Sequence, residues 1–260
     1  MKQFLLKFSI AVLLVGLIEA TPSQPLLTFV FAGQSNMVGK RCKPENLTKD
    51  LQKENPDALF FDAKKKSWTP IAPGKTEVSG FGPEIAIAAT MTKELGQPIG
   101  IIKHSRGGMN LHQQWNPENP KSLFTSLNQQ VEDARKLRPI KVVGMLWVQG
   151  GADAKTAEMA NTYSDNLKKL IQSSRQHFQN PEMLFLSGRI PPKSSRTKPH
   201  WKIVRKAQQG LQLQGYQWVN CDDISTGSDN IHYDEAGMVK LGERQAKMML
   251  VILKASDELN

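Results

Sequence analysis

Short apolar runs alternate with longer helical segments along most of this chain. Strands are expected at residues 26–32, 58–62, 98–103, 142–148, 183–187 and 217–220. Helices are expected at residues 82–95, 123–137, 156–178, 202–213 and 236–255. Near-continuous apolar strands that alternate with helices indicate a parallel sheet covered on both faces. We therefore predict an α/β fold, a three-layer α/β/α sandwich with a central, mostly parallel sheet.

Residues that could take part in chemistry follow several of these strands. Ser35 comes after the first strand, Gly107-Gly108 after the third and Gln149 after the fourth, and the segment 229–232 follows the last strand at a short distance. In parallel sheets, ligands bind beyond the carboxyl ends of the strands. We expect these residues to meet at one edge of the sheet.

Length and composition fit a single globular domain. The chain has 260 residues, of which 39% are hydrophobic and 22% are charged, so disorder is not expected. Its formal net charge of +10 indicates a solvated basic surface and can also favour anionic partners. The chain carries no zinc-finger spacing or aromatic-rich basic motif, so we do not expect it to bind nucleic acid.

The N-terminus is typical of a secretory signal peptide. Residues 1–7 form a short basic start with Lys2 and Lys7, residues 8–18 form an apolar run, and a small residue and a polar break follow at Ala20. We predict cleavage near Ala20, a mature esterase domain at 21–260, and a secreted or periplasmic location. The alternative is an uncleaved anchor. No second apolar stretch approaches membrane-spanning length, so no stable membrane insertion is expected after cleavage.

Ser35 and His232 are candidates for a nucleophile and its base. Asp229 lies three residues before His232, so one loop can deliver a carboxylate to Nδ1 while Nε2 faces the serine. Ser35 can instead cap a helix, and a lone histidine is more often structural. Three other carboxylates compete for the orienting role: Asp222, Asp223 and Asp234.

Gly107-Gly108 and Gln149 are candidates for an oxyanion hole. Acyl transfer needs donors aimed at the oxygen that becomes negative, and a glycine N–H and a glutamine amide can both serve. An ordinary turn and a loop-supporting side chain are the structural alternatives. The serine turn differs from Gly-x-Ser-x-Gly, because Met37 replaces the second glycine.

Four sequence blocks resemble the SGNH-hydrolase superfamily, and within it the branch of sialate O-acetylesterases and carbohydrate esterase family six, which includes acetyl xylan esterases. They are Gly33-Gln34-Ser35-Asn36-Met37, Arg106-Gly107-Gly108 with Trp115, the segment 147–153, and 229–237 with 241–244. The resemblance implies a flavodoxin-like fold and hydrolysis of acetyl esters on sugars, without a metal or other cofactor.

The resemblance also implies roles for individual residues. Ser35 would be the nucleophile, His232 the base and Asp229 its partner. The N–H groups of Ser35 and Gly108, with the Gln149 amide, would form the oxyanion hole. Substrate contacts are expected from the other motif residues: Gln34, Asn36, Arg106, Gly107, Trp115 and Asp153. One residue departs from the family pattern, since Gly151 stands where a glutamate is usual.

We therefore predict an enzyme, a serine esterase that removes acetyl groups from sialic acid or an acetylated polysaccharide through an acetyl-enzyme. The alternatives are a catalytically impaired carbohydrate-binding protein, of which Gly151 would be the first sign, and a lipid esterase, which needs a wide acyl groove. Which sugar is used is left open.

The pairing of Cys42 with Cys221 is also left open, since a disulfide and two buried thiols are about equally expected.

The loop 188–202 is rich in basic residues and contains Trp201. It follows a strand, so we expect it on the same face as the site. Its charges either only solvate the surface, which is the commoner case, or recognise an anionic acetylated glycan, with Trp201 stacked on a sugar ring.

Overall fold

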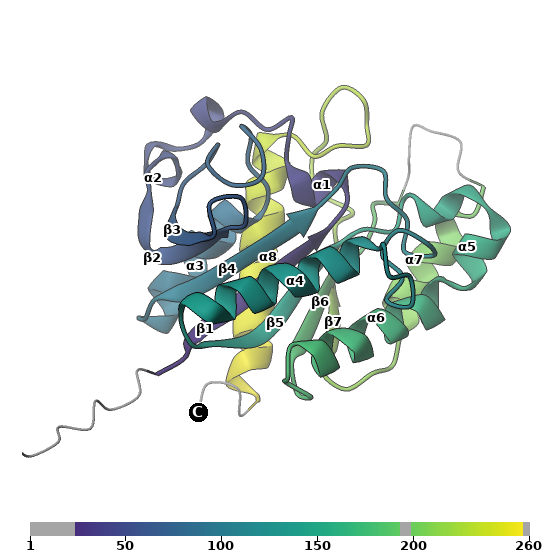
Figure 1. The fold of residues 1–260 in the computed structure, drawn as a ribbon. Coiled ribbons are helices and arrows are strands. Elements are labelled where there is room, and N and C mark those ends of the chain that lie inside the picture. Colours follow the sequence, from purple (N-terminus) through teal and green to yellow (C-terminus); the bar gives the residue numbers. More distant parts are fainter. Residues whose placement is uncertain (1–23, 193–198, 257–260) are drawn as a thin grey trace, which may run out of the picture.

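The core of the molecule is a seven-stranded sheet with the strand order β3-β2-β4-β1-β5-β6-β7 (Figure 1). The computed structural model describes residues 24–192 and 199–256. The strands are β1 Leu26–Gly33, β2 Asn55–Asp62, β3 Ser67–Ile71, β4 Ile99–Ser105, β5 Ile140–Val148, β6 Leu184–Gly188 and β7 Tyr216–Val219. Every neighbouring pair is parallel except β2 and β3. The predicted α/β class with a mostly parallel sheet is confirmed.

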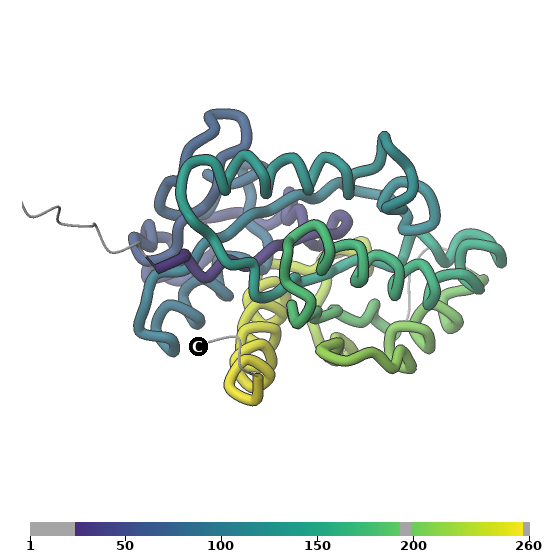
Figure 2. The backbone as a smooth tube through the Cα atoms, turned by 60° about the horizontal axis from the view of Figure 1, so that its bottom comes forward, coloured from purple at the N-terminus to yellow at the C-terminus, as the bar shows by residue number. Residues whose placement is uncertain are grey.

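Helices cover both faces of this sheet. They are α1 Ser35–Val38, α2 Lys49–Gln52, α3 Glu84–Leu95, α4 Leu123–Leu137, α5 Ala157–Asn161, α6 Tyr163–His177, α7 Trp201–Gly210 and α8 Glu235–Lys254, with short 3-10 turns η1 Pro44–Asn46 and η2 Asp153–Lys155. Helices α3 and α8 pack together on one face, and α4 and α6 lie on the other (Figures 1 and 2). Two buried apolar clusters, one on each side of the sheet, make the core.

Two features of the fold differ from the sequence prediction. The single helix expected at 156–178 is divided into α5 and α6 at Thr162. The Thr162 hydroxyl donates to the Glu158 carbonyl at 2.9 Å, and such bonding to the helix's own backbone bends helices. Strand β3 was not predicted, because Pro70 and partly exposed positions weaken its pattern. As the antiparallel edge strand it tolerates a proline.

The ends of β1, β4 and β5 are level with one another at one edge of the sheet. Gly33, the last residue of β1, is paired with Ser105 of β4 and with Val148 of β5. A side chain at position 33 would begin 2.3 Å from the Val148 carbonyl oxygen, and Gly33 has φ +151°, so this close approach requires glycine. The three segments that follow these strands therefore start side by side.

The predicted signal peptide, residues 1–20, lies outside the described residues, and the domain start at residue 21 stays a prediction. Within residues 24–192 and 199–256, no helix has both the length and the apolar character needed to cross a membrane.

Candidate active site

Ser35 is the first residue of α1, directly beyond the end of β1. Gln34 before it is extended, and the helix ends at Gly39, which adopts the left-handed conformation with φ +73°. The first N–H groups of a helix have no partner within it, so the backbone N–H of Ser35 is left for other acceptors. The Ser35 side chain is partly exposed.

Asp229 and His232 form a hydrogen-bonded pair in the loop between β7 and α8. His232 Nδ1 lies 2.6 Å from Asp229 Oδ2, while Asp229 Oδ1 accepts the backbone N–H groups of His232 at 2.9 Å and Ile231 at 3.0 Å. Asn230 between them has φ +50°, which is uncommon for a residue other than glycine. The tight turn lets the carboxylate bind both the ring and the backbone of the same histidine.

The Asp229 carboxyl is held in its ionised form. Partial burial raises its pKa, but the hydrogen bonds from the His232 ring and from the backbone of His232 and Ile231 outweigh burial and hold the pKa well below its usual range. The Arg41 guanidinium also donates to Asp229 Oδ2. An ionised Asp229 keeps the Nδ1 proton of His232 directed toward itself, so Nε2 is the nitrogen that can accept another proton.

Ser35 and His232 open into the same cavity, which has a volume of about 210 Å³. Gly107 also lines it, and a side chain at Gly107 would begin 3.8 Å from Ser35 Cβ. The structure thus brings together three segments from the ends of β1, β4 and β7, as expected from the sequence. A serine and an oriented histidine in one cavity are the components of nucleophilic acyl transfer.

Asn36 joins the serine helix to the histidine loop. Its side chain donates from Nδ2 to the Ile231 carbonyl oxygen at 3.1 Å and accepts the Tyr233 N–H at Oδ1, also at 3.1 Å. Asn36 was expected to contact substrate. It lines the cavity, but it is buried and its amide is bonded to the protein on both atoms.

Gly108 has the backbone freedom expected of an oxyanion donor. It adopts φ +76°, and a side chain there would meet no atom within 4 Å, so its backbone borders open space. The Gln149 side chain is arranged differently. Its Nε2 donates to the Met109 carbonyl at 3.0 Å and to Asp153 Oδ2 at 2.5 Å, and its exposed fraction is only 1%. Both Gln149 amide hydrogens thus point to protein atoms in this structure, and its role as an oxyanion donor stays a prediction.

Three residues expected to contact substrate have other surroundings. Trp115 is fully buried and packs edge-on against Trp147, with ring centroids 5.1 Å apart. Asp153 is also fully buried, and its carboxylate accepts the N–H groups of Leu111 and His112. Arg106 is exposed and lines a separate hollow. Trp115 and Asp153 therefore support the loop that carries Gly108. The sequence motifs did not reveal that these two side chains point inward.

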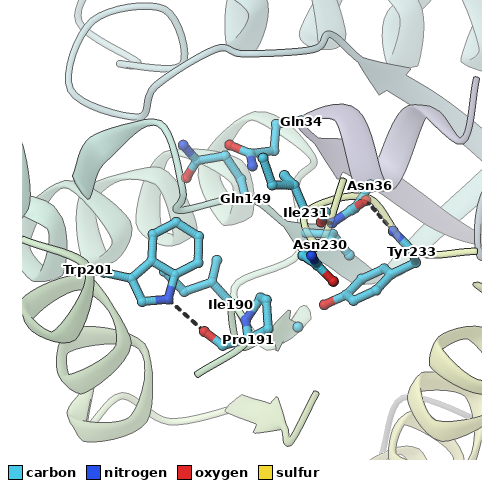
Figure 3. Close-up of a pocket in the computed structure, with 11 residues that line it drawn as sticks. Gln34, Asn36, Gln149, Ile190, Pro191, Trp201, Asn230, Ile231 and Tyr233 are labelled. Carbon is cyan, nitrogen blue, oxygen red and sulfur yellow. Dashed lines mark hydrogen bonds between the residues drawn. The ribbon is translucent and has the colours of Figure 1, made fainter. Parts of the chain in front are cut away.

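Figure 3 shows a second, smaller cavity. The two cavities share Asn36 and Tyr233. Gln34 lines the smaller cavity as expected, and its Oε1 accepts the Ala152 N–H at 3.3 Å. Trp201 faces it from the start of α7 and donates from Nε1 to the Pro191 carbonyl at 2.6 Å.

The Trp201 ring occupies the space beside Gly151. A side chain at position 151 would begin 3.1 Å from two carbons of the indole ring and 3.2 Å from Gln34 Nε2. The glutamate that the family resemblance leads us to expect at this position would require the ring to move. The departure at Gly151 is therefore matched by an aromatic side chain from α7, and it leaves Ser35, Asp229 and His232 in place.

The basic loop 188–202 is only partly described, since residues 193–198 are outside the described ranges. Arg189 does not face solvent as an anion-binding residue would. It is buried, bonds to Asp222 at 2.8 Å and to Asn220 at 2.7 Å, and its guanidinium lies 4.5 Å from the centre of the Trp218 ring. Arg189 is a structural cation that fixes the turn after β7.

Cys42 and Cys221 are free, buried thiols, so the disulfide alternative is wrong for this structure. Each sulfur has a backbone carbonyl 3.6 Å away, that of Tyr233 for Cys42 and that of Val219 for Cys221. Burial is the main cause that raises the pKa of each thiol to about 12, and nearby carboxylates add to the shift at Cys42.

A buried ion pair beneath α1 was not found by the sequence analysis. Lys103 of β4 and Glu84 of α3 have fully buried side chains, with Nζ 2.8 Å from Oε1. Lys103 also donates to the Val38 carbonyl at 3.3 Å, at the end of α1. The pair ties the serine helix to β4 and α3. The sequence contained a signal for it, since a lysine in an apolar strand is rarely fully buried without a partner.

A family model identifies the chain. The model described as "Carbohydrate esterase, sialic acid-specific acetylesterase" matches residues 25–251. The chain belongs to this family. It is therefore a carboxylic ester hydrolase, and the family indicates an acetylated carbohydrate as its substrate.

The esterase is similar to several known proteins. It is 25% identical over 253 residues to a probable carbohydrate esterase of Arabidopsis thaliana, with 88% of this chain and 92% of that protein covered. A crystal structure of an Arabidopsis thaliana protein has a TM-score of 0.76 at 23% identity, over 87% of this chain and 98% of that one. The structure of NanS has a TM-score of 0.70 at 13% identity, covering 91% and 100%. A carbohydrate acetylesterase of Xanthomonas citri has a TM-score of 0.65 at 18% identity, covering 88% and 57%. The structural likenesses confirm the predicted SGNH-type fold.

Proposed function

We propose that the esterase removes O-acetyl groups from carbohydrates by a serine mechanism. The observation that supports this most strongly is the contact of 2.6 Å between His232 Nδ1 and Asp229 Oδ2, in a loop whose histidine shares a cavity with Ser35. An ionised Asp229 orients the ring and stabilises the imidazolium that forms when His232 accepts a proton.

The reaction proceeds in two halves. His232 Nε2 takes the proton of Ser35 Oγ as that oxygen attacks the acetyl carbonyl carbon, and the carbonyl oxygen becomes negative. The backbone N–H groups of Ser35 and Gly108 are the proposed donors to this oxygen. Gln149 would be a third donor after its Nε2 exchanges the Met109 carbonyl for the substrate oxygen. His232 then gives its proton to the departing sugar oxygen. Water, activated by the same histidine, attacks the acetyl-enzyme and releases acetate.

Acetate release by purified protein tests the function. A panel of O-acetylated glycans should yield acetate, and acetyl esters of a simple alcohol should be cleaved faster than octanoyl esters. Preference for octanoyl would favour a lipid esterase. Binding of acetylated glycans without acetate release would favour a carbohydrate-binding protein on this scaffold.

We propose that the enzyme is exported with its first 20 residues removed. The apolar segment 8–18 and the small residue Ala20 support this. N-terminal sequencing of the protein recovered outside the cytoplasm of its host should start near residue 21. Recovery of the full chain in the membrane fraction would instead indicate an uncleaved anchor.

A further inference from the structure

Arg41 occupies a position from which it can act on substrate. It follows α1 in the chain and lines the cavity that contains Ser35 and His232, together with Lys40. Its side chain is 63% exposed, whereas the Asp229 carboxylate, to which it donates a hydrogen bond, is 25% exposed. Arg41 is therefore a cation at the solvent-facing rim of the site, bonded to the carboxylate that orients His232.

The bond between Arg41 and Asp229 can be exchanged at low cost. Ion pairs with an exposed partner contribute little to stability, because water solvates the separated charges well. Asp229 does not depend on Arg41 for its partners, since it also accepts the His232 ring and two backbone N–H groups. An incoming carboxylate would offer the guanidinium the same chemical group that it binds now.

We propose that Arg41 is a specificity-determining residue, which exchanges Asp229 for a carboxylate of the acetylated sugar. A guanidinium suits this task, since its planar donors match a carboxylate with two parallel hydrogen bonds. Lys40 on the same rim adds positive charge. Neutral acetylated sugars lack the carboxylate that Arg41 would bind, so Arg41 would remain bonded to Asp229. This inference rests on the proposed acetylesterase function.

A matched pair of substrates isolates this contact. One is an O-acetylated hexuronic acid, and the other is the O-acetylated hexose with a hydroxymethyl group in place of the carboxylate. Any change that Arg41→Gln causes through Asp229 and His232 affects both substrates, because the same histidine serves both. The ratio of kcat/KM for the acidic sugar to kcat/KM for the neutral sugar therefore reports on the carboxylate contact alone.

Lys43→Gln is the control variant. It removes the same charge two residues away, from an exposed side chain that is not among those lining this cavity in the described residues. General attraction of anions by a basic surface would lower the ratio in both variants. A direct contact would lower it in Arg41→Gln only.

We expect Arg41→Gln to lower this ratio roughly 10-fold, mainly through a higher KM for the acidic sugar. Lys43→Gln should leave the ratio within about two-fold of wild type, since exposed charges at a distance are screened by salt. Equal ratios in Arg41→Gln and wild type, or equal losses in both variants, would overturn the proposal. If wild type releases acetate from neither sugar, the proposed function itself fails for these substrates, which is a different result from an unchanged ratio.

Discussion

Asn36 is hydrogen-bonded to the backbone on both sides of His232. The residue before the histidine accepts from Asn36 Nδ2, and the residue after it donates to Asn36 Oδ1, each at 3.1 Å. Asn36 also follows Ser35 directly in α1. One side chain thus fixes the position of the His232 loop relative to Ser35, two segments that lie far apart in the sequence.

Replacing Asn36 should reduce catalysis more than substrate binding. Asn36→Ala removes both bonds to the histidine loop, and a small displacement of a catalytic group can lower the rate roughly 100-fold. We expect kcat to fall about 10- to 100-fold with little change in KM, and the free energy of unfolding to fall by about 1–3 kcal/mol. Steady-state kinetics and urea denaturation measure these effects.

Asn180→Ala is the matched control for this variant. Asn180 is also buried, donates to the Val142 carbonyl at 3.0 Å and accepts the Glu182 N–H at 3.0 Å, away from the cavity. It should lose similar stability and keep its kcat. An equal loss of kcat in both variants would show that Asn36 contributes only to folding.

Gly108→Ala should separate backbone strain from oxyanion binding. Gly108 and Gly96 both have positive φ values, +76° and +62°, and a side chain at either meets no atom within 4 Å. Alanine in this conformation costs about 1–2 kcal/mol at each site. If the Gly108 N–H binds the oxyanion, the variant should also lose up to about 100-fold in kcat through displacement of the donor. Gly96→Ala, at the end of α3, should retain full activity. Equal activity of the two variants would show that a methyl group at position 108 neither displaces its backbone N–H nor contacts the bound acetyl group.

The two cysteines should be unreactive in the folded protein. Burial raises the pKa of each thiol to about 12, so the thiolate is scarce at neutral pH. We expect iodoacetamide to label neither cysteine in native protein and both after unfolding without reductant. An intact mass that shows no labelling even after unfolding would indicate the disulfide instead.

The overall fold was predictable because it depends on local patterns. Apolar strands alternating with helices predict a parallel sheet, and that sheet places Ser35 and Gly107 at one edge. The antiparallel strand β3 was missed because Pro70 and its partly exposed positions weaken the strand pattern. The burial of Trp115 and Asp153 was also not predicted. Their sequence motifs do not distinguish a buried side chain from one that contacts substrate. The Asn36 bonds were missed for a different reason, because they join segments far apart in the sequence.

Asp229 should make stability depend on pH in the acidic range. Its pKa is lowered in the folded protein from an ordinary value of 3.8, so its contribution is fully present above that value and is lost as the pH falls toward the folded pKa. The difference in free energy of unfolding between wild type and Asp229→Asn should shrink as the pH falls below about 4, because Asp229 then becomes protonated. Urea denaturation at several pH values measures it. A difference that stays constant below pH 4 would contradict the ionised, hydrogen-bonded state of Asp229.

The most direct test of the serine mechanism is the detection of acetate on Ser35 itself. Wild-type enzyme mixed with a reactive acetyl ester, quenched in acid within the first turnovers and digested, should give a peptide containing Ser35 that carries one acetyl group. Ser35→Ala should give no such adduct and no acetate release above background. Undiminished turnover by folded Ser35→Ala protein, with no acetylated peptide in wild type, would contradict the assignment of Ser35 as the nucleophile.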